Sequence, residues 1–362
     1  MLVRILLSCL LLLVPCDIGA IQIGLSERTI ELDPEINEKV LALKPEQVPI
    51  LMERASADDV EAQCVLGVAY ERGSSVPRDE GQAIRWLTKV AVRGVGWAQN
   101  LLGVVYERGG NVPPDYSQAL NWFRSAAERR YPAAANNLGY MFLNGRGVTK
   151  DYVQAAYWFA IAAAAAYAPA QNNLGQLYEH GLGVPKDYST ASNLYRQAAQ
   201  KGLASAQNNL GAMYEAGLGV SKDYKEAVKW YRASAEQGES VGQSNLAFMY
   251  AHGQGIQRDL REAAKWYQQA AESGYAPAQG RLAQLYEKGQ GVPLDYVMAY
   301  SWYTKAVCGG HEVSKRAMAS LSQRMTSRQL QAAQSGFLNR INCKHDEERL
   351  DAVIVEKKLS IH

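Results

Sequence analysis

A unit of 36 residues repeats along most of this 362-residue chain. The clearest copy, AQNNLGAMYEAGLGVSKDYKEAVKWYRASAEQG, occupies residues 206–238. Steps of 36 residues from Leu210 reach a leucine in every other copy, at Leu66, Leu102, Leu138, Leu174, Leu246 and Leu282. An aspartate thirteen residues after this anchor leucine recurs with the same period. Seven copies without an insertion or deletion predict a stacked array of similar small units.

Within each unit, the spacing predicts two helices joined by a glycine turn. Alanine four residues before the anchor and an aromatic four residues after it share one buried helix face. Gly217 and its counterparts suit the left-handed residue that ends a helix. Asp223 and its counterparts suit the N-cap of the second helix, and glutamine or glutamate three residues later predicts a capping box in five units. We interpret the tryptophan column at Trp230 as core packing.

The segments outside the array predict caps and an export signal. The repeats span residues 59–310, and we expect helical caps at 21–58 and 311–343 and a mobile tail at 344–362. Residues 1–20 are typical of a secretory signal peptide. Its apolar run is too short to span a bilayer, so we expect no membrane span after cleavage. Lipid attachment at Cys16 is an alternative to simple cleavage.

Three cysteines, Cys64, Cys308 and Cys343, remain after the predicted cleavage. Cys308 ends the last repeat, and Cys343 follows the next predicted helical pair. A disulfide between Cys308 and Cys343 is one interpretation, and small buried thiols are the other.

Composition and motifs give little support for chemistry. The 38 basic and 36 acidic residues leave a net charge of +2, without a basic run, which argues against nucleic acid as a ligand. The five histidines lack metal-site spacing, so we expect neither a metal nor a cofactor. One GxSxG match places Ser240 between Gly238 and Gly242, but a nucleophile elbow needs a preceding strand, and here a helix is expected. The sequence therefore predicts no enzyme, with a cell-wall-active or β-lactam-related hydrolase as the alternative.

The pattern AxAxxxLGxxYxxGxGVxxDxxxAxxWYxxAAxxG, written almost in full by residues 204–238, resembles the Sel-1-like repeat (SLR), a relative of the tetratricopeptide repeat. The resemblance covers all seven units. It implies an all-α, right-handed solenoid of helix pairs that acts as a scaffold or adaptor for protein complexes. The stretch AMASLSQRMTSRQLQAAQ resembles the terminal cap of exported bacterial SLR proteins, which implies a periplasmic or secreted protein and a role in contact with host cells. A eukaryotic adaptor of the endoplasmic reticulum lumen is the alternative within the family.

The first helices of a stacked array line its concave groove, and positions two residues on either side of the anchor leucine are expected to point into it. Asparagine amides there can pair with an extended peptide backbone, while aromatic side chains hold apolar groups. Alternatively, the asparagines only solvate the groove or bridge neighbouring repeats. We expect a protein or peptide partner, and the sequence does not predict the oligomeric state. The predicted groove consists of Asn100, Asn136, Tyr140, Asn172, Gln176, Asn208, Phe248 and Gln284.

Overall fold

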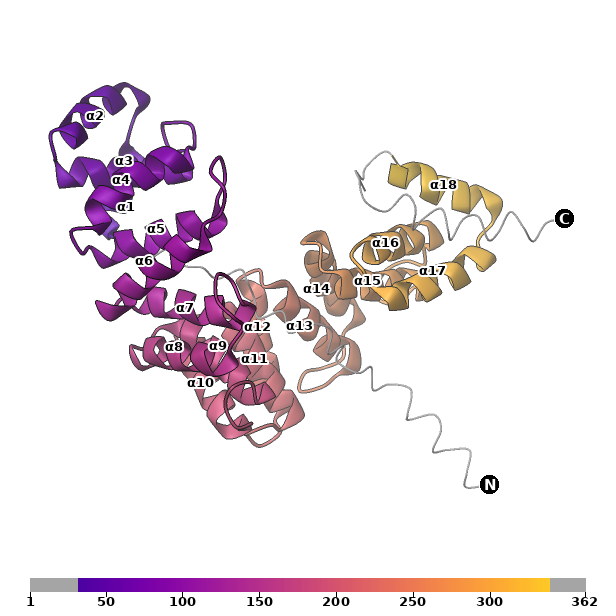
Figure 1. Ribbon diagram of the computed structural model, residues 1–362. Coiled ribbons are helices and arrows are strands. Elements are labelled where there is room, and N and C mark those ends of the chain that lie inside the picture. Colours follow the sequence, from indigo (N-terminus) through magenta and orange to yellow (C-terminus); the bar gives the residue numbers. More distant parts are fainter. Residues whose placement is uncertain (1–31, 339–362) are drawn as a thin grey trace. The chain divides into compact units, whose positions relative to one another are not determined.

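The computed structural model describes residues 32–338, and this part of the chain is all-helical, as the repeat predicts (Figure 1). The first helices of the seven repeats are α3 (Val60–Arg72), α5 (Gly96–Arg108), α7 (Pro132–Asn144), α9 (Ala168–His180), α11 (Ala204–Ala216), α13 (Ser240–His252) and α15 (Ala276–Lys288). The second helices are α4 (Glu80–Ala91), α6 (Tyr116–Glu128), α8 (Tyr152–Ala164), α10 (Tyr188–Gln200), α12 (Tyr224–Glu236), α14 (Leu260–Glu272) and α16 (Tyr296–Cys308). The predictions for residues 1–20, Cys16, Cys343 and the tail at 344–362 lie outside the described residues.

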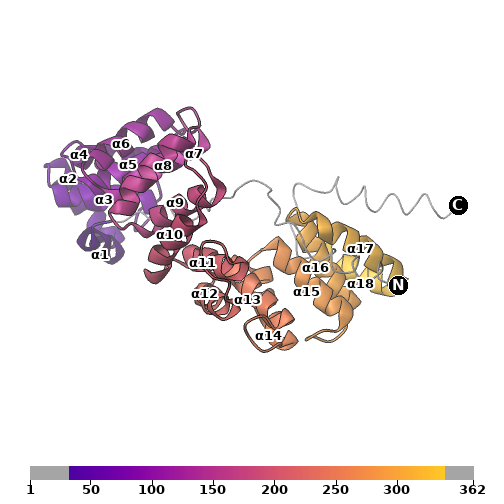
Figure 2. The ribbon, with the colours of Figure 1, turned by 90° about the horizontal axis from the view of Figure 1, so that it is seen from below.

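The array divides into two compact units, one ending at Ala165 and the other starting at Ala166. In a repeat array each copy packs only on its neighbours, so an unbroken period does not guarantee one rigid body. Within each unit, successive helix pairs lie side by side (Figures 1 and 2). Unit 1 therefore holds α1 to α8, and unit 2 holds α9 to α18.

Additional helices pack on both ends of the array. On the N-terminal side, α1 (Pro34–Ala42), the 3₁₀ turn Pro45–Gln47 and α2 (Val48–Ser56) precede the first repeat, and α1 and α2 pack on α3. On the C-terminal side, α17 (Glu312–Arg324) and α18 (Ser327–Leu338) pack on α16. Thr326 and Gln329 form a capping box at the start of α18, because they exchange side chain to backbone hydrogen bonds in both directions.

Each second helix begins at the predicted aspartate. The Asp259 carboxylate accepts the backbone N–H groups of Arg261 and Glu262 at 2.8 and 3.1 Å, and the other six aspartates cap their helices in the same way. The other half of the predicted capping box is wrong. The Asp259 N–H donates instead to the carbonyl of Tyr250 at 3.0 Å, and every repeat makes this bond. The aspartate therefore ties the end of the first helix to the start of the second.

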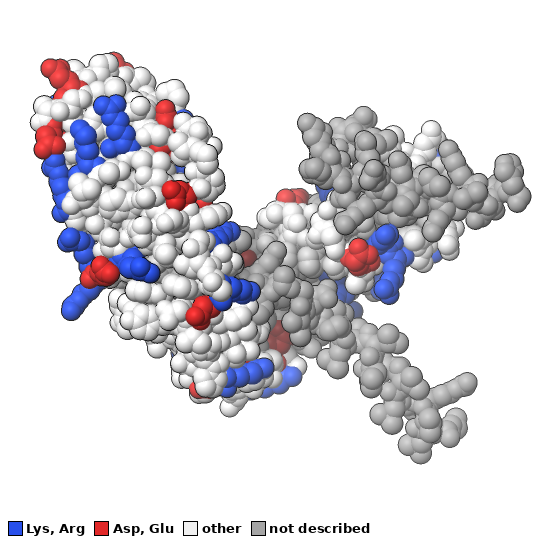
Figure 3. Space-filling view, in the orientation of Figure 1, with Lys and Arg blue, Asp and Glu red and all other residues white. Residues whose placement is uncertain are grey.

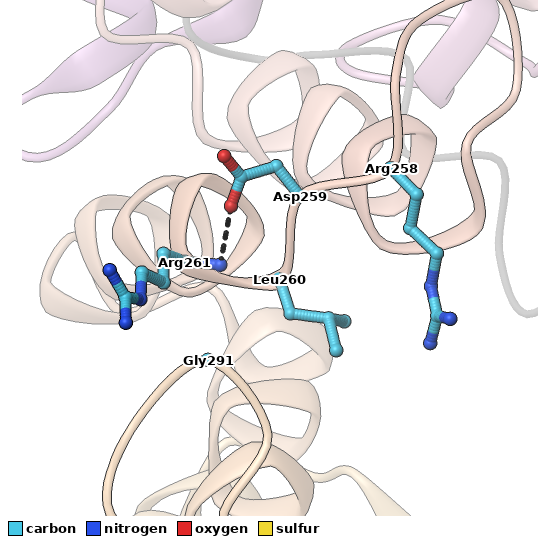
Figure 4. Close-up of a pocket in the computed structure, with 5 residues that line it drawn as sticks. All are labelled: Arg258, Asp259, Leu260, Arg261 and Gly291. Carbon is cyan, nitrogen blue, oxygen red and sulfur yellow. Dashed lines mark hydrogen bonds between the residues drawn. The ribbon is translucent and has the colours of Figure 1, made fainter.

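The turn between the two helices packs on the preceding repeat. Gly291 lies against the start of α14, beside Leu260 (Figure 4). A Cβ on Gly291 would come within 2.0 Å of the Leu260 carbonyl oxygen, and a Cβ on Gly219 would come equally close to that of Tyr188. Both glycines also have positive φ, +75° and +67°. Glycine is required here both for the left-handed backbone and for contact with the neighbouring backbone.

The first two repeats build this turn differently, as their sequences suggest. Ser75 holds a positive φ of 61° and donates its hydroxyl to the carbonyl of Leu43, so its turn packs on the N-terminal cap. Asn111 instead exchanges two hydrogen bonds with Glu80, at 3.0 and 3.1 Å. These two turns face partners that the later turns do not have, which explains why glycine is absent from this position.

The core of each repeat holds a large side chain one position after the tryptophan column, and this side chain is aromatic in six of the seven copies. Tyr231 is 1% exposed, whereas its neighbour Trp230 is half-buried. A Cβ on Gly211 would come 2.7 Å from the Tyr231 ring, so the glycine after the anchor leucine makes room for this ring. The tryptophans pack beside the core, and only Trp86 and Trp302 are buried. Members of the core column are Leu87, Phe123, Phe159, Tyr195, Tyr231, Tyr267 and Tyr303, all 3% exposed or less.

Where the core aromatic is tyrosine, its hydroxyl usually meets a glutamate of the first helix. The hydroxyl of Tyr231 donates to Glu215 at 2.6 Å, and Tyr195 with Glu179 and Tyr303 with Glu287 repeat this pair. Where the core residue is Leu87 or Phe123, the glutamate of that repeat instead pairs with an arginine from the next one, as Glu71 with Arg108 and Glu107 with Arg146. Each of these buried carboxylates therefore has a partner.

Tyr267 is the exception, because Ala251 stands where the glutamate is expected. Burial raises the pKa of Tyr267 to about 12, so its hydroxyl is neutral and can donate. We expect Ala251→Glu to raise the free energy of unfolding by about 1 kcal/mol, the net value of one such hydrogen bond. Thermal unfolding measures the gain. The same substitution made in a Tyr267→Phe background is expected to bring none, and an equal gain there would contradict the pairing.

Candidate binding surface

The first helices of successive repeats contact one another directly. Within unit 2, α11 packs on α13, and α15 packs on α17 of the C-terminal cap, in addition to the contacts that each makes with its own second helix. Helix α11 is therefore enclosed by its partner helix α12 and by α10 and α13 of the neighbouring repeats.

Asparagines join the first helices of unit 2 in a directional chain. The side-chain amide of Asn245 donates to Asn208 at 2.8 Å, Asn208 donates to Asn209 at 3.4 Å, and Asn209 donates to Asn172 at 3.0 Å. In unit 1, Asn137 donates to Asn100 at 2.9 Å in the same direction. The bridging role, which the sequence left open, is therefore the one that these contacts support.

Half of the predicted groove residues do not face a groove. Asn100, Asn136 and Asn172 are 0, 1 and 5% exposed. Tyr140 is 5% exposed and packs edge-on against Phe159, with 5.5 Å between ring centroids. A helical wheel omits the neighbouring helices: Asn100 and Asn172 meet the next first helix, and Tyr140 meets its own second helix. These four residues therefore occupy interior positions, contrary to the prediction.

The other four predicted residues remain accessible, and all lie in unit 2. Gln176, Asn208, Phe248 and Gln284 are each half-buried, one on each of α9, α11, α13 and α15. We call these four residues, together with His252 and Arg281, the unit 2 face. Small neighbours keep this face open, because Ala212 and Ser244 occupy positions where unit 1 has Tyr140 and Asn136.

Phe248 is the apolar centre of the unit 2 face. Its ring stacks on the exposed ring of His252, with 4.0 Å between centroids, and His252 is fixed by a 2.9 Å contact from Nδ1 to the Phe248 carbonyl. On α15, the first helix of the next repeat, Arg281 donates to Gln284 at 3.4 Å. Arg281 replaces the asparagine found in the four preceding repeats, at Asn137, Asn173, Asn209 and Asn245. This break in the column is visible in the sequence alone.

A second polar column was also missed by sequence reasoning. Five glutamines each donate a side-chain N–H to a carbonyl near the end of the preceding helix, eight residues earlier, at 2.9 to 3.3 Å: Gln63, Gln99, Gln207, Gln243 and Gln279. Helix ends leave their last carbonyls without a partner in the helix. The column therefore caps helices and recurs for a structural reason.

The GxSxG match lies at the junction of two helices. Ser240 is the first residue of α13 and follows α12, so it lacks the strand, turn and helix of a nucleophile elbow. Gly242 packs there against Ser234, the contact that explains the second glycine of the motif. A shallow pocket of about 350 Å³ is the gap left where one turn meets the preceding helix (Figure 4). Its lining residues are Arg258, Asp259, Leu260, Arg261 and Gly291.

Between residues 32 and 338, none of the helices has the length and apolar character needed to cross a bilayer.

Comparisons with known proteins agree with this architecture. The family model described as Sel1 repeat matches residues 60–91, 98–131, 132–167, 168–203, 204–239, 240–275 and 276–311. A Sel1 repeat protein from Oxalobacter formigenes has a solved structure that is 30% identical, with a TM-score of 0.65, covering 79% of this chain and 85% of that one. A protective antigen of uropathogenic Escherichia coli strains with an SLR fold is 24% identical, with a TM-score of 0.47, covering 92% of this chain and 98% of that one. A search among curated proteins gave no match.

Proposed function

Because the chain belongs to the Sel1 repeat family, whose repeats mediate protein interactions, we propose that it is a non-catalytic scaffold that binds a protein or peptide through the unit 2 face. The observation that carries the proposal is the half-buried ring of Phe248, stacked on exposed His252 and flanked by amide side chains of the neighbouring repeats. Aromatic groups set among adaptable polar ones are typical of protein-binding surfaces.

The side chains of this face favour an extended segment of the partner. The side-chain amide of Gln284 carries a donor and an acceptor, which suits the alternating N–H and C=O groups of a peptide backbone, whereas the amide of Asn208 is engaged by Asn209 and Asn245. Phe248 would contact an apolar side chain of that segment. Arg281 lies on α15, the first helix of the next repeat, and can pair with a carboxylate. The expected partner therefore presents an apolar residue followed by an acidic one.

The proposal also includes location. The first twenty residues are typical of a secretory signal, and the solved Sel1 neighbours come from bacteria. We therefore place the protein in the bacterial envelope or among secreted proteins, with a partner there or on a host cell. Recovery of the unprocessed chain from the cytoplasm alone would contradict this location.

Substituting Phe248 tests the surface. We expect Phe248→Ala to weaken binding of the partner by about tenfold or more, because a central aromatic anchor contributes most of the energy of such a surface. Crosslinked capture from the compartment that holds the protein identifies the partner, and titration with the purified partner measures the loss.

Gln269→Ala is the matched control, since Gln269 is exposed on the second helix α14, away from the first helices. It should leave the affinity unchanged. Thermal unfolding of both variants separates lost binding from lost folding. Full retention of every partner by the Phe248→Ala, Asn208→Ala and Gln284→Ala variants would refute the proposed surface.

A further inference from the structure

Helix α8 in unit 1 exposes an apolar stripe. Val153, Tyr157 and Ile161, spaced four residues apart on one helix face, are 61, 56 and 37% exposed. Exposed Ala160 and Ala164 flank them. Most of the surface at the position of α8 in Figure 3 is white, free of charged side chains. We call these five residues the α8 face.

The equivalent positions of the other repeats show that this apolar character is specific to α8. Tyr157 occupies a column whose other members are all polar: Arg85, Asn121, Asn193, Lys229, Lys265 and Ser301. Of the seven second helices, α8 is the one whose sequence contains no charged residue. Folding of the repeat does not require an apolar residue at these positions, because six copies fold with a polar residue in the Tyr157 column. The α8 face therefore needs another explanation.

The α8 face is also held in shape. The Tyr157 ring packs edge-on against Trp158, with 5.2 Å between ring centroids and an interplanar angle of 77°. Ala160 and Ala164 leave shallow spaces beside Tyr157 and Ile161. Large side chains next to small ones on one helix allow close packing of another helix, ridge into groove.

We propose that the α8 face binds the α8 face of a second copy of this chain, with the two helices antiparallel across a two-fold axis. In such an interface a patch meets itself, so any charge on the patch would face a like charge. A helix without charged residues avoids this repulsion. The antiparallel arrangement also places the positive end of each helix dipole beside the negative end of the other. Tyr157 lies near the middle of α8, and the two copies of it meet close to the axis.

The features of α8 do not fit attachment to a lipid surface. Helices that lie in the membrane interface carry lysine and arginine on their polar face. Within Tyr152–Ala164 there is neither, and the buried side of the helix, with Ala155 and Phe159, packs within the repeat. Three large side chains in each copy bury less than the roughly 800 Å² per partner of a standard interface. The expected dimer is therefore weak, with a dissociation constant in the micromolar range.

Sedimentation velocity of the full chain, from about 5 to 300 µM, tests the pairing by mass action. Wild-type protein should shift from monomer to dimer over this range. Tyr157→Glu and Tyr157→Lys should each remain monomeric, and an equimolar mixture of the two should associate again, because opposite charges then meet at the axis. Asn193→Glu, at the same position of the repeat in α10, should dimerise like wild type.

Three outcomes would overturn the proposal. These are a wild-type monomer at the highest concentration, a mixture of the Glu and Lys variants that does not associate, or an equal loss of dimer in Asn193→Glu. Co-sedimentation of monomeric protein with phosphatidylcholine vesicles would identify a lipid surface as the occupant and would equally refute it. Phe248→Ala should still dimerise, which keeps this test independent of the unit 2 face. Thermal unfolding confirms that each variant is folded.

Discussion

Tyr231→Ala is expected to lower the free energy of unfolding by about 5 kcal/mol. Loss of a buried aromatic costs about 3–5 kcal/mol, and the Glu215 carboxylate also loses the hydroxyl that donates to it. Tyr231 is 1% exposed, and its ring fills the space that Gly211 leaves. Chemical denaturation of the full chain, followed through the midpoint of the transition, measures the effect.

Trp230→Ala is the matched comparison, because it removes a larger side chain from the adjacent position. Trp230 is half-buried, and its indole N–H lacks a hydrogen-bond partner among the described residues. We expect its removal to lower the free energy of unfolding by about 2 kcal/mol. A larger effect for Trp230→Ala than for Tyr231→Ala would show that the tryptophan column is the true core.

Gly219→Ala is expected to have the second large effect, lowering the free energy of unfolding by about 3 kcal/mol. The added Cβ would come within 2.0 Å of the Tyr188 carbonyl oxygen, and the left-handed backbone adds its own penalty for alanine. Backbone lies on both sides of this contact, so neither partner can move away as a side chain would. Thermal and chemical unfolding of the full chain both report the loss.

Gly202→Ala separates the two causes. Gly202 also has positive φ, +89°, but nothing lies within 4 Å of its Cβ position. The equivalent residues of two other repeats are Arg130 and Ala166, which adopt φ values of 62° and 59°. We expect a loss of about 1 kcal/mol, the backbone penalty alone. If Gly219→Ala and Gly202→Ala lower the free energy of unfolding equally, the close contact between repeats at Gly219 contributes nothing to the effect of the added methyl group.

The parts of the fold that could be predicted depend on local chemistry. An aspartate before a helix and a glycine after one have a single physical role each, so Asp259 and Gly217 were assigned correctly from their period. The choice between Trp230 and Tyr231 was not local. Adjacent residues on a helix differ in direction by about 100°, and both are aromatic. Which one enters the core depends on where the first helix approaches, and Gly211 was the only signal in the sequence.

The candidate site was harder to predict because it depends on neighbouring repeats. Asn136 and Asn208 each lie two residues before the anchor leucine of their repeat, yet Asn136 is buried and Asn208 is half-buried. Packing between repeats causes this difference in exposure. A helical wheel represents a single helix, so it cannot show which of its faces a neighbouring repeat covers. The α8 face could have been found from sequence by comparing each outward position with its counterparts in the other copies, since Tyr157 departs from a column of polar residues.

The asparagine chain has a consequence for how long such an array can be. Asn208 accepts from the following repeat, and Asn209 donates to the preceding one, so this copy offers one acceptor and one donor to its two neighbours. Removal of residues 204–239 would bring Asn245 to the acceptor that Asn209 now uses, and duplication of the same segment would insert a matching pair. A repeat can thus be gained or lost without leaving an asparagine side-chain amide unpaired at either junction. The number of repeats, and with it the length of the binding surface, can therefore change by whole repeats while the hydrogen bonds between neighbouring repeats stay the same.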